Sequence, residues 1–570
     1  MNKTINNNQL RLTDVNKEVT LYGWVANKRK FGELNFVDLR DKFGITQLVF
    51  NQPIHFSKES VLEVTGTVVA RKDPNNDLPT GQIEVVVKDF KVLSTSKELP
   101  FQIRDDIEVK EELRLKHKFL DLRRPVMQKT LKLRNDLIFA VREYLQNEGF
   151  TELETPILSK ATPEGARDFL VPTRNYNSFY ALPQSPQLFK QLLMIAGFEK
   201  YYQFARCFRD EDSRKDRQPE FTQLDMEVSF MDVEHFQSYI EKMFQYFMKK
   251  VMNVEVQIPF QRLRFDDCIR DYGSDKPDLR YGNKIVDIPE FCNDTEFNII
   301  KDAPSKRLLK IDEAITKKEF KTLEEIAKKN KVKALFFMSV ENGEIVATNF
   351  ANKVSEAANN LIKAQNNPNG TYLICADKFE NASQALGALR VELNSWYNWA
   401  KDEYNFSWII DWPMFEYDEE TNTWAAAHHP FTQFDNTLEE LDTLPKEQIR
   451  AKSYDLVLNG FELGSGSARI FDEQMQKKMF EMIGMDEKTQ QNKFGFFLKA
   501  FEYGVPPHCG IGLGIDRLVM ILANHKTIRD VIAFPKNSKS DDMLTEAPGG
   551  VDQTQLDELF IQLKEKETQN

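Results

Sequence analysis

The 570-residue chain has an ordinary globular composition, with 41% hydrophobic and 29% charged residues, and is long enough for two to four domains. Its net charge of −12 argues weakly against a nucleic-acid partner, although residues 1–124 carry +3 and the remainder −15. No apolar run reaches the roughly 18 residues of a membrane span, and no CxxC or zinc spacing occurs. The polar N-terminal stretch lacks the features of a signal peptide, so we expect a cytoplasmic protein without a membrane partner.

The first predicted elements are short strands. Within residues 1–105, five segments rich in Val, Ile, Phe and Thr are separated by turn residues, at 18–27, 33–41, 45–50, 61–70 and 81–93. Five strands in about 100 residues are typical of a small closed barrel such as an OB-fold. The charged segment 106–125 is interpreted as a hinge.

A longer mixed pattern follows. Residues 126–149 place Leu133, Leu137 and Val141 on one helical stripe, and an extended segment interrupted by Pro156 comes next. Strands are predicted up to about 235, followed by a helix near 236–252. Residues 284–403 are lysine-rich and contain no chemical motif, so they are interpreted as an insertion, after which the sheet pattern resumes.

The stretch FRDEDSRKDRQPEFTQLD, residues 208–225, places ten charges between two apolar strands. Strand alternation predicts that Leu224 and Met226 face the core, whereas Phe221 and Asp225 face the other side. An aromatic ring beside Arg209 on a polar sheet face suits a flat base attached to a phosphate. The alternative is a solvated hairpin loop.

A second hairpin is predicted around Asn459-Gly460. Pairing about this turn sets 457 opposite 462 and 455 opposite 464, which makes Asp455 and Glu462 diagonal neighbours about 7–8 Å apart. Such carboxylates could share Mg²⁺ with substrate phosphates; the alternative is two exposed acids on an edge strand. Strict alternation sends Arg469 to the face opposite Glu462, unless a bulge in GSGS re-aims it.

The third motif is GIGLGIDRLVMIL, residues 510–522, in which a glycine-rich segment precedes a helix. Arg517 would lie in the first turn, where backbone N–H groups already favour an anion. The spacing matches neither a Rossmann fingerprint nor a P-loop, so the glycines alone are a weak signal.

These motifs, in this order, resemble motifs 1, 2 and 3 of the class II aminoacyl-tRNA synthetases, with motif 1 formed by the helix and strand that end at Pro156. The order barrel, hinge, catalytic sheet is similar to the Asp/Asn/Lys subgroup. Within it, the strings ATPEGARDF, QSPQLFKQLLM, HHPFT and DVIAFPK, together with the long insertion, resemble the bacterial-type aspartyl-tRNA synthetases.

The resemblance implies a multidomain fold: an N-terminal OB-fold β-barrel and an α+β class II catalytic domain with an antiparallel sheet and an inserted α+β domain. The implied boundaries are 1–105 for the anticodon-binding barrel, 106–125 for the hinge, 126–283 and 404–570 for the catalytic domain with its C-terminal extension, and 284–403 for the insertion.

The resemblance also implies an activity, the ligation of L-aspartate to tRNA-Asp through an aspartyl-adenylate made from ATP, in a homodimer. Arg209 and Arg517 would be catalytic, and Asp455 and Glu462 would hold Mg²⁺ through ATP. The implied ATP-binding residues are Arg209, Asp210, Glu211, Arg217, Gln218, Phe221, Glu462, Gly514, Ile515, Asp516 and Arg517.

For the amino acid, the resemblance implies a pair of cations, Lys190 and Arg469, on the side-chain carboxylate. The full set of implied aspartate-binding residues is Glu164, Gln187, Lys190, Arg209, Asp225, His428, His429 and Arg469. With Ser185 as helix cap and Pro186 in the first turn, Gln187 and Lys190 share one side of a helix. The alternatives are a lysine that extends to solvent along the helix and a pair of surface histidines.

The barrel residues implied to bind the anticodon are Arg29, Phe36 and Gln47, and the alternative for Phe36 is a core side chain. The chain departs from the family pattern at Asn27, where a basic residue is usual, and at LGSGS, where three glycines are more common. The rival interpretations are an asparaginyl- or lysyl-tRNA synthetase, an OB-fold nucleic-acid-binding protein with an inactive synthetase-like domain, and a tRNA-independent amide-forming ligase.

Overall fold

The structure, a computed structural model, describes residues 3, 5–161, 166–289, 298–349, 356–418 and 421–564. The chain divides into two compact units, which are described separately. One comprises Met1–Lys132 and Arg529–Gly549, and the other comprises Leu133–Ile528 and Gly550–Asn570. No helix within the described residues is long and apolar enough to cross a bilayer.

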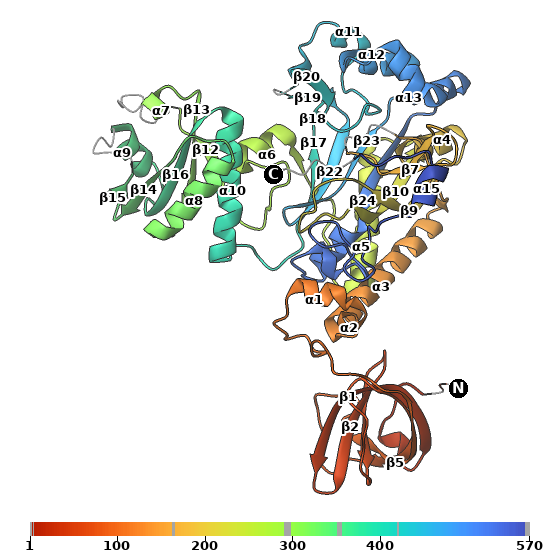
Figure 1. The fold of residues 1–570 in the computed structure, drawn as a ribbon. Coiled ribbons are helices and arrows are strands. Elements are labelled where there is room, and N and C mark those ends of the chain that lie inside the picture. The colour runs from red at the N-terminus through yellow and green to blue at the C-terminus, as the bar shows by residue number, and fades with distance from the viewer. Residues whose placement is uncertain are drawn as a thin grey trace. The chain divides into compact units, whose positions relative to one another are not determined.

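The first unit contains a closed five-stranded barrel in the order β1-β2-β3-β5-β4, as the five predicted strands indicated (Figure 1). All neighbouring strands are antiparallel except β3 and β5, which are parallel. The strands are β1 (Glu18–Phe31), β2 (Leu34–Arg40), β3 (Ile45–Phe50), β4 (Val61–Ala70) and β5 (Ile83–Ser94), preceded by η1 (Leu12–Asp14).

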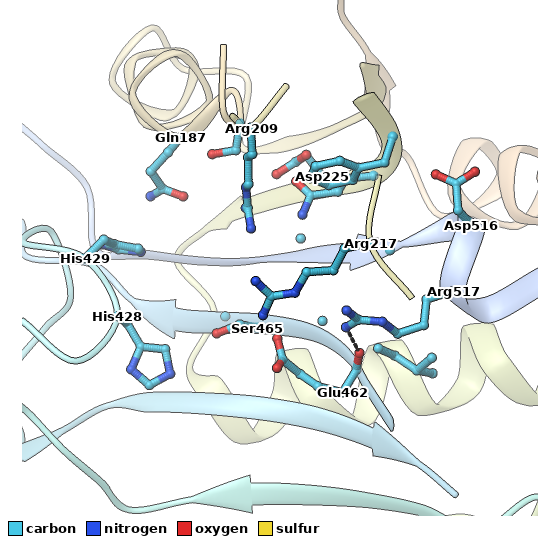
Figure 2. A pocket seen from close by; sticks show the side chains of 18 of the residues that line it. Gln187, Arg209, Arg217, Asp225, His428, His429, Glu462, Ser465, Asp516 and Arg517 are labelled. Carbon is cyan, nitrogen blue, oxygen red and sulfur yellow. Dashed lines mark hydrogen bonds between the residues drawn. The ribbon is translucent and has the colours of Figure 1, made fainter. Parts of the chain in front are cut away.

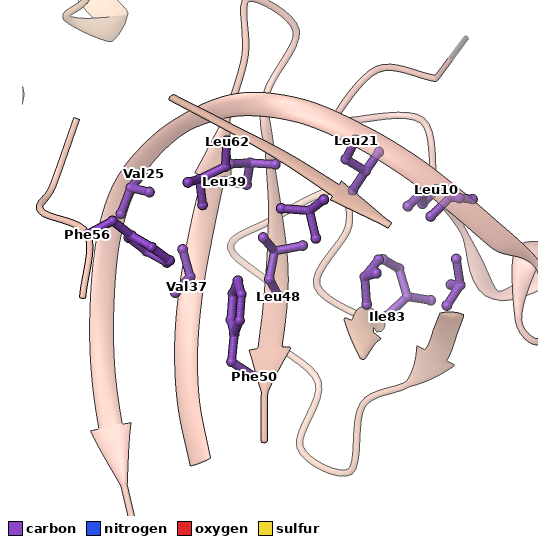
Figure 3. Packing of buried hydrophobic residues seen from close by; sticks show 14 residues of the cluster. Leu10, Leu21, Val25, Val37, Leu39, Leu48, Phe50, Phe56, Leu62 and Ile83 are labelled. Atoms are coloured by element: carbon purple, nitrogen blue, oxygen red, sulfur yellow. The ribbon is translucent and has the colours of Figure 1, made fainter. Parts of the chain in front are cut away.

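Alternate residues of these strands fill the barrel. Val37 and Leu39 of β2 and Leu62 and Val64 of β4 are fully buried, whereas the residues between them are only partly buried. Figure 3 shows these apolar side chains gathered inside the barrel, where Phe50 and Phe56 join them. The outward-facing residues are therefore free to be polar and to contact a ligand.

A buried ionic cluster follows the barrel in α1 (Glu111–Lys116) and α2 (Lys118–Asp121). Asp121 is completely buried and accepts hydrogen bonds from Lys118 at 2.7 Å and Arg124 at 2.8 Å, and Arg114 lies 3.6 Å away. Burial by itself would raise the pKa of Asp121, but the ion pairs with Lys118 and Arg124 outweigh it, and the net shift is downward.

Replacing Asp121 by asparagine is expected to lower the free energy of unfolding by about 3–5 kcal/mol, because it leaves buried cations without a counter-charge. Since the pKa of Asp121 is lowered from 3.8, this contribution is complete above that pH and is lost on acidification below it. Chemical denaturation at neutral pH measures the effect, with Asp106→Asn as an exposed control. Equal stability of the two variants would contradict the assigned role of the cluster.

The second unit is built on an eight-stranded sheet of order β11-β17-β22-β23-β24-β10-β9-β6. Neighbouring strands within this sheet are antiparallel, except for the parallel outer pairs β11–β17 and β6–β9. The strands are β6 (Thr151–Glu152), β9 (Lys200–Phe208), β10 (Glu220–Ser229), β11 (Gln261–Arg264), β17 (Phe406–Ile410), β22 (Ser453–Leu458), β23 (Phe461–Ala468) and β24 (His508–Gly514). The barrel and this largely antiparallel sheet confirm the predicted fold class.

The sheet is accompanied by α3 (Pro125–Asn147), α4 (Gln187–Ile195), α5 (Val233–Phe247), η2 (Met248–Met252) and α14 (Ile515–Leu522). The outer elements are α6 (Phe265–Tyr272), α11 (Leu438–Leu441), η3 (Lys446–Gln448), α12 (Glu473–Met482), α13 (Glu487–Ala500), η4 (Phe501–Tyr503), η5 (Ile528–Asp530), α15 (Gln553–Glu558) and the small strands β7 (Leu170–Pro172), β8 (Phe179–Ala181), β18 (Trp412–Pro413), β19 (Phe415–Asp418), β20 (Thr423–Ala426) and β21 (Arg450–Ala451).

A separate five-stranded sheet of order β12-β13-β16-β14-β15 lies between β11 and β17 in the sequence. The helices α8 and α10 lie on one face of this sheet, and α7 and α9 lie on the other (Figure 1). Apolar side chains of each pair of helices pack against the strands. The elements are β12 (Ile285–Asp287), α7 (Asn298–Lys301), β13 (Ser305–Ile311), α8 (Lys317–Lys329), β14 (Leu335–Glu341), β15 (Glu344–Thr348), α9 (Glu356–Lys363), β16 (Gly370–Asp377) and α10 (Phe379–Tyr397).

Candidate active site

A cavity of about 410 Å³ lies over the middle of the eight-stranded sheet. Its walls come from β10, β23 and β24, from the start of α4, from the loop between β9 and β10, and from the segment 427–429. The predicted residues that line it are Gln187, Lys190, Arg209, Glu211, Arg217, Gln218, Phe221, Asp225, His428, His429, Glu462, Arg469, Gly514, Asp516 and Arg517. Side chains up to 330 positions apart in the sequence thus meet in one place.

The β10 strand supplies one wall by simple alternation. Leu224, Met226 and Val228 are buried in the core, whereas Phe221 and Asp225 line the cavity, as the pattern predicted. The guanidinium carbon of Arg209 lies 5.2 Å from the centroid of the Phe221 ring. A ring with a cation over it is suited to hold a planar group that carries negative charge.

Three arginines extend into the same half of the cavity (Figure 2). Arg217 pairs with Glu211 at 2.8 Å, and Arg517 contacts Asp216 at 3.2 Å and donates to the backbone carbonyl of Glu462. The Nε atoms of Arg209 and Arg517 are buried, and among the described residues they have no hydrogen-bond partner. This half of the cavity therefore offers unused donors to an anionic ligand.

The hairpin of β22 and β23 differs from prediction by one residue. Val457 lies opposite Glu462 as expected, but Asp455 lies opposite Ser465 rather than residue 464, because a β-bulge at Leu463 shifts the register. The bulge precedes the GSGS segment instead of lying within it. It re-aims the strand so that Glu462 and Arg469 both reach the cavity.

The two carboxylates of this hairpin are electrostatically linked. Burial raises the pKa of Glu462, and the neighbouring Asp455 raises it further. Asp455 is also 3.5 Å from His428 Nε2. An acid whose pKa is raised by a neighbouring carboxylate favours a cation beside it, although among the described residues no cluster of three or more metal-ligating side chains occurs.

The other half of the cavity holds four buried charges. Lys190 Nζ lies 3.1 Å from Asp225 Oδ1 and 3.4 Å from Glu227 Oε2. Arg469 donates to both oxygens of Glu227, at 2.8 and 3.2 Å. All four side chains are at most 2% exposed.

Burial raises the pKa of Asp225 in spite of Lys190. Burial would also raise the pKa of Glu227, but Arg469 and Lys190 reverse the shift and hold it below its ordinary value. The Arg469 guanidinium also contacts His429 Nε2 at 2.7 Å, and burial together with this cation lowers the pKa of His429 well below its ordinary value. Because a guanidinium can only donate, His429 accepts this bond as the neutral ring.

Sequence reasoning missed Glu227, although it lies two residues after Asp225 on the same strand face and bridges both cations. A Cβ added at Gly510 would lie 1.8 Å from Glu227 Oε2, so the glycine leaves space for this carboxylate. Gly510 therefore acts through close packing against β10. Other lining residues that were missed include Ser185, Asp216, Gln223, Ser465 and Ser467.

Some predicted residues have other positions. Of the predicted ATP-, aspartate- and metal-binding residues that the structure describes, Asp210, Asp455 and Ile515 are not among those that line the cavity. The Asp210 amide bonds to the Arg167 carbonyl at 3.0 Å, and Ile515 is buried. The α4 helix begins at Gln187 with Pro186 at its N-cap, one residue later than expected. Glu164 lies outside the described residues.

The predicted barrel residues lie together on the outer face. Arg29 is opposite Phe36 in the β1–β2 pairing, and Arg29 Nη2 donates to Gln47 Oε1 at 3.2 Å. Phe36 is next to the buried Val37 and so faces outward, which excludes the core alternative. Gln47 Nε2 donates to Glu84 at 3.0 Å, so Glu84 is a further member of this group.

Comparisons with known proteins agree with both parts. The family described as "tRNA synthetases class II (D, K and N)" matches residues 110–538, and an "OB-fold nucleic acid binding domain" family matches residues 19–93. The chain is 47% identical over 566 residues to the aspartate–tRNA ligase of Malacoplasma penetrans, covering 96% of this chain and 97% of that one. It is 46% identical over 571 residues to the aspartate–tRNA(Asp/Asn) ligase of a Geobacillus species, covering 96% of each.

Among solved structures, an asparaginyl-tRNA synthetase from Pyrococcus horikoshii, complexed with asparaginyl-adenylate, matches with a TM-score of 0.59. The match covers 94% of this chain and 98% of that one, at 20% sequence identity. Such a distant match establishes likeness of fold.

Proposed function

This chain belongs to the class II tRNA synthetases of the D, K and N group and has the activity of an aspartate–tRNA ligase, and we propose that the cavity over β10, β23 and β24 is its active site. One observation carries the proposal. A ring and three arginines fill one half of the cavity, and two buried cations, Lys190 and Arg469, fill the other.

The arginine-rich half binds ATP. The adenine stacks on Phe221, opposite the Arg209 guanidinium, and the phosphates meet Arg209, Arg217 and Arg517. The unused Nε donors of Arg209 and Arg517 support this assignment, because a buried donor without a partner is costly until a ligand supplies one. The remaining predicted ATP contacts that line this cavity are Glu211, Gln218 and Gly514.

Mg²⁺ fits beside this half through the phosphates of ATP. Glu462 lines the cavity, and Asp455 raises its pKa, so a divalent cation would relieve their repulsion. Hard oxygen ligands of this kind suit Mg²⁺, which is usually held by one or two carboxylates plus substrate phosphates. When bound, the ion balances negative charge on the triphosphate.

The aspartate side chain lies between Lys190 and Arg469. Asp225 orients the lysine and Glu227 holds the two cations in place, while Gln187, with its buried Nε2 free of hydrogen-bond partners among the described residues, contributes to the ammonium end together with Glu164. His428 and His429 close the site. A lysine substrate would meet two like charges here, and asparagine would leave both cations without a new counter-charge.

The reaction needs no side-chain nucleophile. The α-carboxylate of aspartate attacks the α-phosphorus of ATP, an O–P bond forms, and the bond to pyrophosphate breaks. Arg209 and Arg517 stabilise the negative charge that develops, so catalysis consists of positioning and electrostatics. The terminal ribose hydroxyl of tRNA-Asp then takes the aspartyl group, and AMP leaves.

The barrel recognises the anticodon. Phe36 stacks an unpaired base, and Arg29 and Gln47 contact backbone and base edge. The functional division proposed is 1–105 for the barrel, 106–125 for the hinge, 126–283 and 404–570 for catalysis, and 284–403 for the insertion. We place the enzyme in the cytoplasm, in keeping with the absence of a membrane-spanning helix among the described residues.

The proposed function is tested by ATP–pyrophosphate exchange and by aminoacylation with the purified chain. Exchange is expected with aspartate and neither with asparagine nor with lysine. Charging of purified tRNA-Asp and tRNA-Asn, each offered aspartate, separates a single-tRNA enzyme from one that serves both. Exchange driven by asparagine would refute the assignment of the two cations.

A homodimer is also proposed. On α3 and just after the edge strand β6, large apolar side chains are exposed, including Phe139 at 64% and Leu158 at 52%. A second copy of the chain would cover them, as the motif 1 resemblance implies. Light scattering is expected to give twice the chain mass of 66.4 kDa, and Phe139→Asp with Leu158→Asp should halve it. A monomeric mass for the unmodified chain would contradict this proposal.

A further inference from the structure

Both carboxylate oxygens of Asp516, the second residue of α14, are bonded to protein groups. The residue is only 2% exposed. Its Oδ2 accepts the backbone N–H of Thr222 at 2.7 Å, and its Oδ1 accepts from the guanidinium of Arg134. In Figure 2 the carboxylate is directed away from the three arginines of the cavity. Asp516 is therefore placed to act on the cavity through its neighbours.

The bond to Thr222 completes the edge of β10. The pairing of β10 with β24 ends at Gln223 and Gly514, where the chain turns into α14. The Thr222 amide consequently has no strand acceptor on that side, and a buried amide needs one. Because Thr222 follows Phe221 directly, the carboxylate fixes the backbone that carries the ring proposed to stack adenine.

Arg134 supplies the charge that this carboxylate requires. It comes from α3, and its side chain is 18% exposed. A carboxylate buried without a cation would be strongly unfavourable, and Arg134 supplies the counter-charge through this ion pair. The next residue of α14 is Arg517, which lines the cavity. One ion pair thus anchors both the Phe221 backbone and the first turn that presents Arg517.

We propose that Arg134 is a positioning residue for ATP, acting through Asp516 on Phe221 and Arg517. This inference rests on the proposed use of the arginine-rich half-cavity for ATP. Arg134 itself does not line the cavity and makes no contact with the substrate. Loss of Arg134 therefore affects the nucleotide selectively and leaves the four-charge aspartate half intact.

The test is pyrophosphate exchange with Arg134→Met in the full-length chain. We expect the KM for ATP to rise roughly 10- to 100-fold, as a small displacement of positioning groups produces, while the KM for aspartate stays unchanged. Arg134→Lys, which keeps the charge, should recover part of the affinity. The matched control is Arg142→Met on the same helix, which breaks a surface ion pair with Glu152 and should leave both KM values unchanged.

A double-mutant cycle separates positioning from a merely structural role. Because Arg134 acts through Asp516, Arg134→Met combined with Asp516→Asn should weaken ATP no more than the stronger single variant. Additive effects, or an unchanged KM for ATP in folded Arg134→Met, would overturn the inference. If Arg134→Met does not fold, Arg134→Lys replaces it. The KM for ATP is then compared between the single variants Arg134→Lys and Asp516→Asn and their combination.

The failure of the proposed function has a different signature. If Phe221→Ala leaves the KM for ATP unchanged, the ATP half of the cavity is wrongly assigned, whatever Arg134 does. If Phe221→Ala weakens ATP and Arg134→Met does not, only the positioning inference fails.

Discussion

Replacing Lys190 by alanine is expected to abolish aspartate activation, with a fall in kcat/KM for aspartate of at least about a hundredfold. The reason is the burial of the four-charge cluster. Removing one member of a buried charge pair costs roughly 2–5 kcal/mol, because the remaining charges lose their partner. Here the loss leaves Asp225 without its cation and removes one of the two charges proposed to hold the substrate carboxylate.

Pyrophosphate exchange measures this effect, and calorimetric titration with ATP shows whether the nucleotide half is intact. ATP is expected to bind the Lys190→Ala variant as it binds the unmodified chain. Lys242→Ala, an exposed lysine on α5, serves as the control and should leave exchange unchanged. Unchanged exchange in Lys190→Ala would remove the argument for aspartate specificity.

Replacing Arg209 by alanine should lower kcat by roughly 10²–10³, the usual cost of losing one electrostatic donor to a transition state. The side chain lies over the Phe221 ring and has a buried, unused Nε donor among the described residues. It is the one residue assigned to both ATP and aspartate. The rate of pyrophosphate exchange should therefore fall even when both substrates are saturating.

The control is Arg206→Ala on β9, the strand that ends one residue before Arg209. Arg206 pairs with Glu220 at 2.6 Å and, unlike Arg209, does not line the cavity. It should retain full exchange activity. If the two variants behave alike, the effect belongs to the stability of β9, and the role given to Arg209 is wrong.

Strand periodicity was enough to predict one wall of the cavity. The alternation in 221–228 correctly separated the core residues from Phe221 and Asp225, because a strand buried on one face must alternate. The three motifs and their order identified the family, and the five barrel segments were predicted close to their observed bounds. Local sequence carries this information because each element must satisfy its own burial pattern.

Other features depend on contacts that no local pattern records. Because of the bulge at Leu463, Asp455 pairs with Ser465 instead of residue 464. Counting residues outward from the Asn459-Gly460 turn assumes regular pairing and therefore cannot predict this shift. Glu227 lies on the strand face that alternation predicted to be polar, but its role was missed because it depends on Arg469, 242 positions later in the sequence. The Arg134–Asp516 pair spans 382 positions and is invisible to any motif.

The burial of the four charges around Glu227 predicts that aspartate selection and tRNA charging respond differently to salt. Mobile ions weaken interactions between solvent-exposed charges over a Debye length of about 8 Å at physiological ionic strength, and they affect buried pairs much less. Aspartate selection should therefore persist in concentrated electrolyte. The anticodon contacts use an exposed barrel face and a polyanionic partner, so tRNA charging should decline first.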